Sequence, residues 1–593
     1  MFAETTPRGR HLRKLRERPT MAAKNTQHCG WPRTPQGRAG VWITRSRRHT
    51  VFGSHALALL ALLGTCFATA NGQNVAERHV AQTPSAFAAT LNEAVRAHPV
   101  AFLDRIGWGA NSAQLAELHR LGAIRFLDAQ LDPRARAALP SPLGRSLSRL
   151  PVNTPLENWV PELIADERST LRARGRISAE SHAAQAANNR LKILRQHANL
   201  LVRQAMQEQL LRAIYAQNQL HQRLIWFWMN HFNVFRGGNI GPMMGDYVRH
   251  VIAPHVLGHF RTLLQATMFS PQMLLYLNNA QNHRGHINEN YAREVMELHS
   301  VGLGAHYTQT DVTDLAHVLT GLGVDLLGRP VHVRPALRAW VWQHGLVVFN
   351  PARHDPQPER VLGHTFAGQG IGEIEQVITV LANDPATARH ISYELAQYFV
   401  ADQPSAALVS SMVRTWEHTH GNIAAVMRTL FMSPQFAASL SQPQFKDPMR
   451  YLLSAVRASY SGRIVTNPQP LIGMLYRLGE PLYGRQTPDG YPLAADAWSS
   501  PGQLTTRFAV AQQLAAGAPA LFLRSEWMHR VSYPLASRAW MIRPAQPPDL
   551  EHSAVFEAAE ATLSQATLST LAQTTDRRRW NALWLSSPEF MTE

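Results

Sequence analysis

Most of the chain carries apolar residues at the spacing typical of α-helices. Between residues 220 and 232, apolar side chains recur every three or four positions and so fall on one face of a helix. Ser270 followed by Pro271 predicts a helix start, because serine can accept from a free backbone amide and proline suits the first turn. Thr308 and Asp311 have the spacing of a capping box. Alternating runs of Val, Ile and Thr are scarce, so the pattern predicts a mainly α fold.

Two segments interrupt the helical pattern. Residues 131–161 are rich in proline and predict a loop or linker. Residues 325–370 are rich in Val, His, Trp, Gly and Pro, which predicts a few short strands or a long ordered loop. We therefore expect one large helical domain over 88–593, preceded by a leader (1–70) and a short linker (71–87).

The N-terminal region has the pattern of an export signal. The first 50 residues hold 12 basic and two acidic side chains, and an apolar run follows at 56–70. That run is shorter than the ~20 residues that span a bilayer, so a cleaved signal is favoured over a membrane anchor. Because the run ends in Ala68-Thr69-Ala70, we expect cleavage near Ala70, export to the periplasm or beyond, and membrane contact only through an uncleaved leader. A twin-arginine signal at Arg47-Arg48 and a lipoprotein-like box ending at Cys66 are the alternatives.

Composition limits the chemistry of the exported part. The net charge is +17 overall, but residues 51–593 hold 46 basic and 39 acidic side chains, so the body is only mildly basic and predicts no nucleic-acid partner. Cys29 and Cys66 are the only cysteines, and both lie in the leader. Disulfides, cysteine-ligated metals and a thiol nucleophile are thereby excluded from the mature chain. No phosphate-binding or dinucleotide-binding glycine motif occurs, so no nucleotide cofactor is expected.

The densest polar segment is residues 288–299. Glu289, Arg293 and Glu297 stand at i, i+4 and i+8, so on a helix they form a ladder of ion pairs. Asn288 can cap this helix, which we expect over 289–301. Together with Asn290, these residues predict a structural polar network.

A second set of residues could carry chemistry. Glu294 lies off the ladder, one turn from Asn290 and beside Glu297, so two carboxylates could face a cation or a hydroxyl. His231 ends an aromatic helix, and His354-Asp355 has the makings of an acid–base pair in a loop. The candidate catalytic residues are Glu294, Glu297, His231, His354 and Asp355, and the candidate metal ligands are Glu294, Glu297 and His231. The competing interpretation of each is structural: an ion-pair network, a core histidine and loop-stabilising hydrogen bonds.

An ordered set of short motifs resembles the bacterial family called domain of unknown function 1800, over roughly residues 88–593. The motifs lie at 103–109, 130–133, 227–232, 288–298, 307–311, 319–321, 354–355, 488–492 and 587–590. The resemblance implies export, a mainly helical fold and an exported alkaline-phosphatase-like or sulfatase-like partner, but no established reaction. Met229 departs from the pattern, because a polar residue is expected before Asn230-His231.

Two functional hypotheses follow. In the first, the chain is a binding or accessory protein that acts with an exported partner. In the second, it is a hydrolase-like enzyme, with or without a divalent metal, that uses Glu294 and Glu297 with His231 and His354-Asp355. The two are distinguished by whether these side chains meet in an open pocket.

Overall fold

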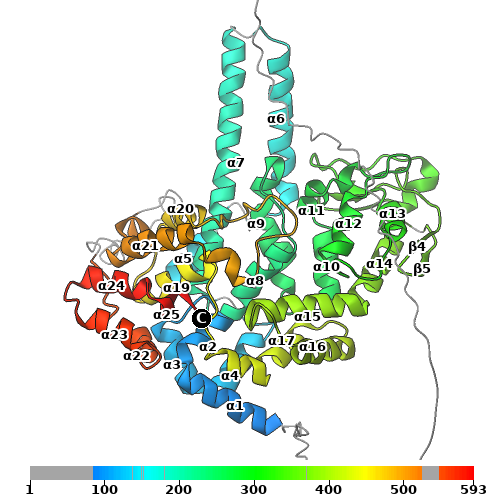
Figure 1. Ribbon diagram of the computed structural model, residues 1–593. Helices are drawn as coiled ribbons and strands as arrows, with labels where there is room; N and C mark the ends of the chain where they lie inside the picture. The colour runs from blue at the N-terminus through cyan, green and yellow to red at the C-terminus, as the bar shows by residue number, and fades with distance from the viewer. Residues whose placement is uncertain are drawn as a thin grey trace, which may run out of the picture. The chain divides into compact units, whose positions relative to one another are not determined.

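Helices make up most of the chain and the few strands are short, as the spacing of apolar residues predicts (Figure 1). The computed structural model describes residues 84–135, 138–148, 150, 153–178, 181–368, 370–523 and 546–593. The predicted leader (1–70) lies outside the described residues, as does all of the predicted linker except its last positions, which are already helical.

The first helices pack around α8 and the C-terminal helices. They are α1 (Pro84–Ala97), α2 (Pro99–Ile106), α3 (Ser112–Leu121), α4 (Ala123–Leu131), α5 (Ser141–Leu147) and the short 3-10 turn η2 (Leu156–Asn158). The proline-rich segment 131–161 is therefore not a continuous loop. Pro142 and Pro161 stand in the first turns of α5 and α6, where the missing N–H leaves no bond unmade.

Helices α6 (Val160–Gly175) and α7 (His182–Tyr215) form a long hairpin that extends away from the neighbouring helices (Figure 1). The 34 residues of α7 correspond to a length of about 50 Å at the rise of an α-helix. Nearly all its buried residues lie from Leu201 onward, where it contacts α8, α19 and α20. Before that point only Ala184, Leu191 and Leu194 are buried.

The central helices carry most of the polar motifs. They are α8 (Gln219–His231), η3 (Gly238–Met243), α9 (Met244–Asp246), the π-helical turn η4 (Tyr247–Ile252), η5 (Ala253–His255), α10 (Phe260–Met268), α11 (Pro271–Tyr276), η6 (Asn279–Gln281), α12 (Asn290–Glu297) and α13 (Gln309–Val318). The predicted helix starts are confirmed, since Ser270 accepts from the amide of Met273, and Thr308 and Asp311 form a capping box.

Helix α12 is shorter than predicted. It ends at Glu297 instead of continuing to residue 301, and the chain turns at Gly302, whose φ is +90°. Asn288 still contributes at the start, because its Oδ1 accepts from the amide of Asn290 at 3.1 Å. The early end exposes residues 302–305 to a cavity described below.

Five short strands occupy the predicted region and its edge. β1 (Leu322–Val324), β2 (Trp342–His344) and β3 (Val347–Phe349) form an antiparallel sheet in the order β1-β3-β2, with Leu322 and Trp342 both opposite Phe349. β4 (Glu359–Val361) and β5 (His364–Phe366) form a separate hairpin, and η7 (Pro335–Trp340) precedes β2.

The remaining elements are helical and return to the N-terminal helices. They are α14 (Ile371–Asn383), α15 (Pro385–Phe399), α16 (Ala406–Thr419), α17 (Ile423–Phe431), α18 (Pro434–Ser439), α19 (Pro448–Tyr460), α20 (Gln469–Arg477), η8 (Ala495–Trp498), α21 (Pro501–Ala515), η9 (Pro519–Phe522), α22 (Ala554–Glu560), α23 (Gln565–Ala572), α24 (Arg577–Leu585) and α25 (Pro588–Met591). The described residues from 84 onward form one compact unit around a large apolar core, with a smaller apolar cluster beneath η2 and α6. No helix in the described part of the chain combines the length and apolar character needed to cross a bilayer.

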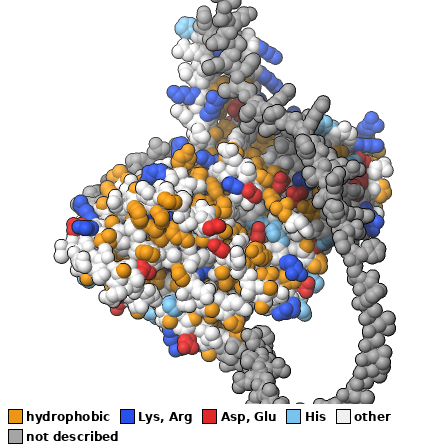
Figure 2. All heavy atoms as spheres, in the orientation of Figure 1, with side chains coloured by type: hydrophobic (Ala, Val, Ile, Leu, Met, Phe, Trp, Pro, Cys, Tyr) orange, Lys and Arg blue, Asp and Glu red, His pale blue; other side chains and the backbone are white. Residues whose placement is uncertain are grey.

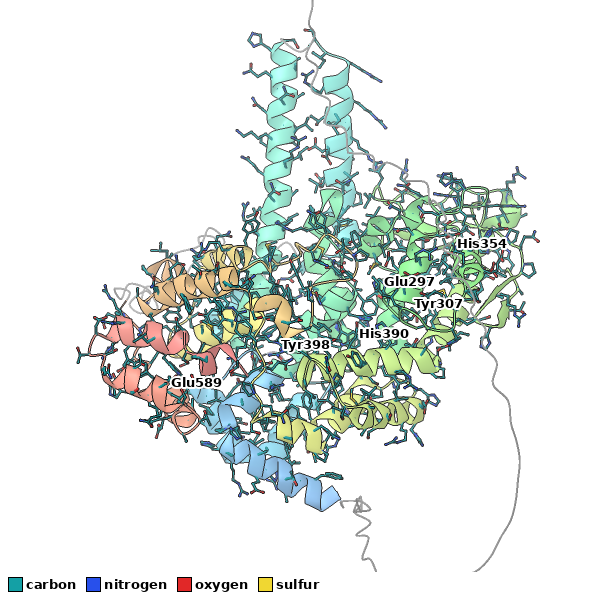
Figure 3. The ribbon with its side chains drawn as sticks, in the orientation of Figure 1. Glu297, Tyr307, His354, His390, Tyr398 and Glu589 are labelled. Carbon is teal, nitrogen blue, oxygen red and sulfur yellow. The ribbon has the colours of Figure 1, made fainter. Side chains whose placement is uncertain are left out.

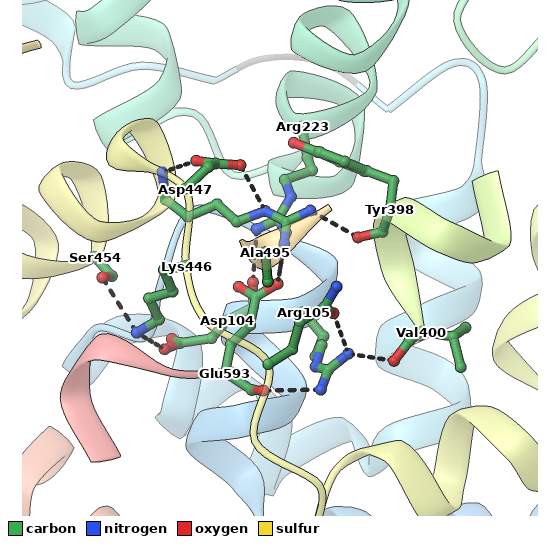
Figure 4. Close-up of polar contacts among 12 residues, drawn as sticks. Asp104, Arg105, Arg223, Tyr398, Val400, Lys446, Asp447, Ser454, Ala495 and Glu593 are labelled. Atoms are coloured by element: carbon green, nitrogen blue, oxygen red, sulfur yellow. Dashed lines mark hydrogen bonds and ion pairs between the residues drawn. The ribbon is translucent and has the colours of Figure 1, made fainter. Parts of the chain in front are cut away.

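A group of buried charges lies inside this core (Figure 4). The side chain of Glu593 pairs with Arg223 and with Arg450, each at 2.9 Å, and its backbone oxygen accepts from Arg105 at 2.8 Å. All four residues are at most 5% exposed. Burial alone would raise the pKa of Glu593, but the three guanidinium groups lower it to about 2.

We expect Glu593→Gln to lower the free energy of unfolding by roughly 3–5 kcal/mol at neutral pH, because it leaves buried arginines without their counter-charge. A depressed carboxyl pKa stabilises the fold above the ordinary value of 4.5, and this contribution is lost as the pH falls toward about 2. The difference between wild type and variant should therefore shrink below that ordinary value. Denaturant unfolding measured across this range checks the expectation.

The exposed Glu551→Gln serves as a control, since it removes the same charge from the surface. Equal stability loss in the two variants would contradict a special role of the buried cluster.

Candidate functional site

An open cavity of about 690 Å³ lies where four segments of the chain meet. Its walls come from the end of α8, from the end of α12 and the turn after it, from the first half of α15, and from the loop before η8. The lining residues that matter for its chemistry are Asn230, His231, Glu297, Arg389, His390, Tyr393, Glu394, Asp489 and Tyr491. Figure 3 shows Glu297 and His390 in this region of the molecule.

The centre of the site is a carboxylate between two histidines. Glu394 Oε2 lies 2.7 Å from His231 Nδ1, and Glu394 Oε1 lies 3.4 Å from His390 Nε2. His390 and Glu394 stand at i and i+4 on α15, so one helical face presents both to His231 on α8. A quarter of the Glu394 side chain remains exposed, whereas the His231 side chain is 2% exposed.

Both nitrogens of each imidazole face an acceptor. His390 Nδ1 is 2.8 Å from the carbonyl oxygen of Ser300, and His231 Nε2 is 3.4 Å from that of His299. Since carbonyls and carboxylates only accept, each ring makes its two contacts best when both nitrogens carry protons. Neither ring then keeps a free nitrogen that could take a proton from a substrate.

The pKa shifts agree with this arrangement. Burial would lower the pKa of His390, but its bonds to Glu394 and to the Ser300 carbonyl raise it above the usual value. Burial would raise the pKa of Glu394, yet the adjacent His231 and His390 hold it well below its ordinary range. Burial and the nearby His231 lower the pKa of His299, which therefore stays neutral beside the pair.

A reciprocal hydrogen-bond pair fixes the loop that closes the cavity. The amide of Tyr491 donates to Asn230 Oδ1 at 2.6 Å, and Asn230 Nδ2 donates to the Tyr491 carbonyl at 2.8 Å. Gly490, with φ of +70°, makes this approach possible, because a Cβ there would lie 2.3 Å from the Asn230 carbonyl oxygen. The adjacent Asp489 is thereby placed at the cavity.

The predicted ion-pair ladder is present on α12. Arg293 pairs with Glu289 at 3.2 Å and with Glu297 at 3.1 Å, and Glu289 also accepts from Thr313 and Gln309 on α13. These side chains are 21–36% exposed, so the ladder is a partly solvated link between two helices and contributes little stability. Asn290, the other predicted member, donates to the carbonyl of Leu277.

Glu294 lies beside the cavity but does not line it. No side-chain hydrogen bond or ion pair engages it among the described residues. Burial raises the pKa of its carboxyl, and the nearby Glu297 and Asp489 add to this effect. Glu294, Glu297 and Asp489 therefore form a group of three carboxylates, in which Glu297 and Asp489 have arginine partners.

His354 and Asp355 belong to a different cluster, near β4 and β5 (Figure 3). His354 Nε2 pairs with Glu373 at 3.1 Å, while Nδ1 faces the Thr320 carbonyl at 3.0 Å. Asp355 pairs with His317 on α13 at 3.0 Å, and its amide donates to Thr320 Oγ1. The structure does not bring this pair to the cavity of His231 and Glu297.

Sequence reasoning did not select Glu394 and His390, the partners of His231. The available signal was the pair His390 and Glu394, whose spacing places both on one face of a helix. The neighbours Arg389 and Tyr393 on that helix are exposed, line the cavity, and have no hydrogen-bond or ion-pair partner within the described residues.

The structure gives the candidate metal ligands other partners. His231 contacts Glu394, and Glu297 contacts Arg293. In the residues that the structure describes, no group of three or more His, Cys, Asp or Glu side chains has an arrangement that could hold a metal ion.

The fold and the site define a helical protein with a carboxylate-bridged histidine pair in an open cavity. Comparison with family models matches residues 101–592 to the family described as Protein of unknown function (DUF1800), so the chain belongs to this family. No curated protein and no solved structure matches the chain.

We expect Glu394→Gln to lower the free energy of unfolding by roughly 1–3 kcal/mol, because it removes a charged partner of two imidazoles. The raised pKa of His390 stabilises the fold below 6.5 and this contribution is lost at higher pH, while the lowered pKa of Glu394 stabilises it above 4.5. The loss should therefore be greatest between these two values and smaller near pH 8. Urea unfolding at several pH values measures it.

Glu417→Gln on α16 is the matched control, since this exposed glutamate has no side-chain partner in the described structure. A loss that does not vary with pH would contradict the ionised network.

We expect Glu294→Gln to leave the melting temperature at neutral pH unchanged or higher. A raised carboxyl pKa means that the fold penalises the charged form above the ordinary value of 4.5, and glutamine removes that penalty. Glu297→Gln, three residues along the same helix, should instead lower the melting temperature slightly because Arg293 loses a partner. A clear destabilisation by Glu294→Gln would reveal a structural partner for this carboxylate.

Proposed function

We propose that this chain is an exported binding protein that holds a small ligand in the cavity between α8, α12 and α15. One observation carries the proposal: Glu394 and backbone carbonyls occupy both nitrogens of His231 and of His390. Imidazoles held in this way stiffen the wall of a site, and they have no free nitrogen that could act as a general base. Such a site is suited to binding.

The character of the cavity supports this proposal. It is open and about 690 Å³ in volume, within the range that accommodates small molecules. Its walls combine apolar groups such as Phe227, Leu298 and Leu493 with a few polar side chains, which is typical of ligand sites. Arg389 and Tyr393 still have free hydrogen-bonding groups at its edge.

Export and the partner are part of the same proposal. The basic and apolar pattern of residues 1–70 supports export, and the family resemblance supports an exported alkaline-phosphatase-like or sulfatase-like partner. On this proposal the chain delivers or retains a ligand for that partner.

A hydrolase is the second candidate, and one observation favours it. Burial raises the pKa of Glu294, which lies beside Glu297, the partner of Arg293, and two neighbouring carboxyls in different surroundings can divide acid and base roles. Hydrolysis of p-nitrophenyl phosphate and p-nitrophenyl acetate distinguishes the candidates. Turnover that Glu294→Gln and Glu297→Gln abolish would establish the hydrolase and overturn the binding proposal.

We expect the apolar dye anilinonaphthalene sulfonate to bind the folded chain saturably, and Ala386→Trp to weaken this binding by roughly tenfold or more. Ala386 lines the cavity at the start of α15, so an indole there fills space that a ligand would use. Fluorescence titration measures the effect.

Ala566→Trp, at an exposed position of α23, adds the same indole outside the cavity and should leave the titration unchanged. Unchanged dye binding by Ala386→Trp, in a variant that melts like the wild type, would mean that the cavity is not the binding site.

A further inference from the structure

The outer part of the α6–α7 hairpin is predominantly positive. Residues 168–203 hold eight Arg and Lys side chains and a single acidic residue, Glu180. The acidic residues of α6 stand nearer its start, and of these Asp166 is paired with Arg190. Figure 2 shows blue side chains along the part of this hairpin that it leaves uncovered.

The packing of the hairpin leaves these charges in solvent. Apart from Ala184, Leu191 and Leu194, which are buried in α7, the two helices are largely exposed along this outer part. Arg174 donates to Asn188 across the hairpin, but Arg168, Arg172, Arg176 and Lys192 are exposed and have no side-chain partner within the described residues. The helix pair therefore presents unneutralised positive charge well away from the helical body.

Apolar side chains accompany the charge. Leu171 is 48% exposed and Ile193 is 54% exposed, and they belong to the few large apolar residues of the described chain that face solvent. Exposed aliphatic groups among arginines are typical of segments that rest on a lipid surface, where the charges meet headgroups and the apolar groups enter the interface. Residues 160–203 contain no Phe, Tyr or Trp, the side chains on which bases mainly stack, which disfavours single-stranded nucleic acid.

We propose that the outer α6–α7 hairpin docks the protein on a membrane surface rich in anionic, phosphate-bearing headgroups. Arginine supplies seven of the eight cations, and its guanidinium binds phosphate oxygens in pairs. The length of α7 holds the rest of the chain, and the cavity at the end of α8, away from the bilayer. This site is independent of the ligand cavity.

Vesicle co-sedimentation of the full chain tests the proposal. We expect binding to vesicles of equal parts phosphatidylcholine and phosphatidylglycerol, no binding to phosphatidylcholine alone, and weakening by salt because the contact is electrostatic. A variant with Arg168, Arg172, Arg176 and Lys192 all changed to Gln should bind at least roughly tenfold more weakly, since each basic group near an anionic surface contributes to affinity.

The matched control changes Arg334, Arg338, Arg414 and Arg578 to Gln, four exposed arginines without a side-chain partner in the described structure. It removes the same charge and should bind vesicles as the wild type does. All three proteins carry the same leader, so a difference between the two variants belongs to the hairpin.

Several results would overturn the proposal. They are equal vesicle binding by the wild type and the hairpin variant, equal loss in the hairpin and control variants, and no wild-type binding to anionic vesicles. Tighter binding to a DNA duplex than to vesicles would also overturn it, by making the hairpin a nucleic-acid contact. Melting temperatures of both variants, expected to equal that of the wild type, show that lost binding is not lost folding.

Discussion

The rest of the structure depends on one buried carboxylate. Glu593 stands at the centre of Arg105, Arg223 and Arg450, and these residues come from α2, α8 and α19. Each guanidinium is almost fully shielded from water, and most of its remaining donors find acceptors within the protein, whereas Nε of Arg105 and of Arg223 has no partner among the described residues. Those acceptors are largely backbone carbonyls at the ends of other helices, and the cluster therefore fixes where several helices end.

This arrangement reaches the cavity at the end of α8 through two helices. Arg223 lies two turns before His231 on α8, and it donates to the carbonyl of Asp104 as well as to Glu593. Arg450 donates to the carbonyl of Tyr398, one turn beyond Glu394 on α15. Because both helices are anchored to the same carboxylate, the positions of His231 and Glu394 relative to each other are set from inside the core.

Aromatic rings reinforce the same connection. The guanidinium carbon of Arg450 lies 4.1 Å from the centre of the Tyr398 ring, and that of Arg223 lies 5.0 Å from it. Tyr398 in turn contacts Phe227, whose ring stacks on His231. Charges that would be costly in an apolar core are thus covered by ring faces, and the same rings form the wall behind the histidine.

Much of the fold could be predicted from the sequence, because helix caps and ion pairs within a helix join residues that are close together in the chain. The helix starts at Ser270 and Thr308 and the ladder of Glu289, Arg293 and Glu297 depend on groups three or four residues apart. The early end of α12 was missed. The turn after this helix brings Gly302 against the ring of His390, a residue far along the chain, and the local spacing of residues carries no signal for that contact.

In the candidate site, too, the residues that local spacing could select differ from those that only the folded structure brings in. His231 and Glu297 were selected from their own helices, and both line the cavity. Glu394, whose Oε2 lies 2.7 Å from His231 Nδ1, is 163 residues away along the chain, and no spacing within one helix could connect the two. His354-Asp355 was a sound local pair, but its neighbours in space are His317, Thr320 and Glu373, so the pair stabilises a loop against α13 and α14.

His354 and His390 differ in their access to a cavity. His354 is enclosed, and both its nitrogens are taken up by one helix and one turn, so a bound molecule has no access to it. His390 is also fully engaged, yet a fifth of its side chain and a quarter of that of Glu394 remain open to the cavity. A ligand can therefore contact the charged network without displacing any of its internal bonds. These bonds support the proposed binding function, because a bound molecule leaves all of them in place, whereas proton transfer to one of these rings would require a nitrogen to give up its present partner.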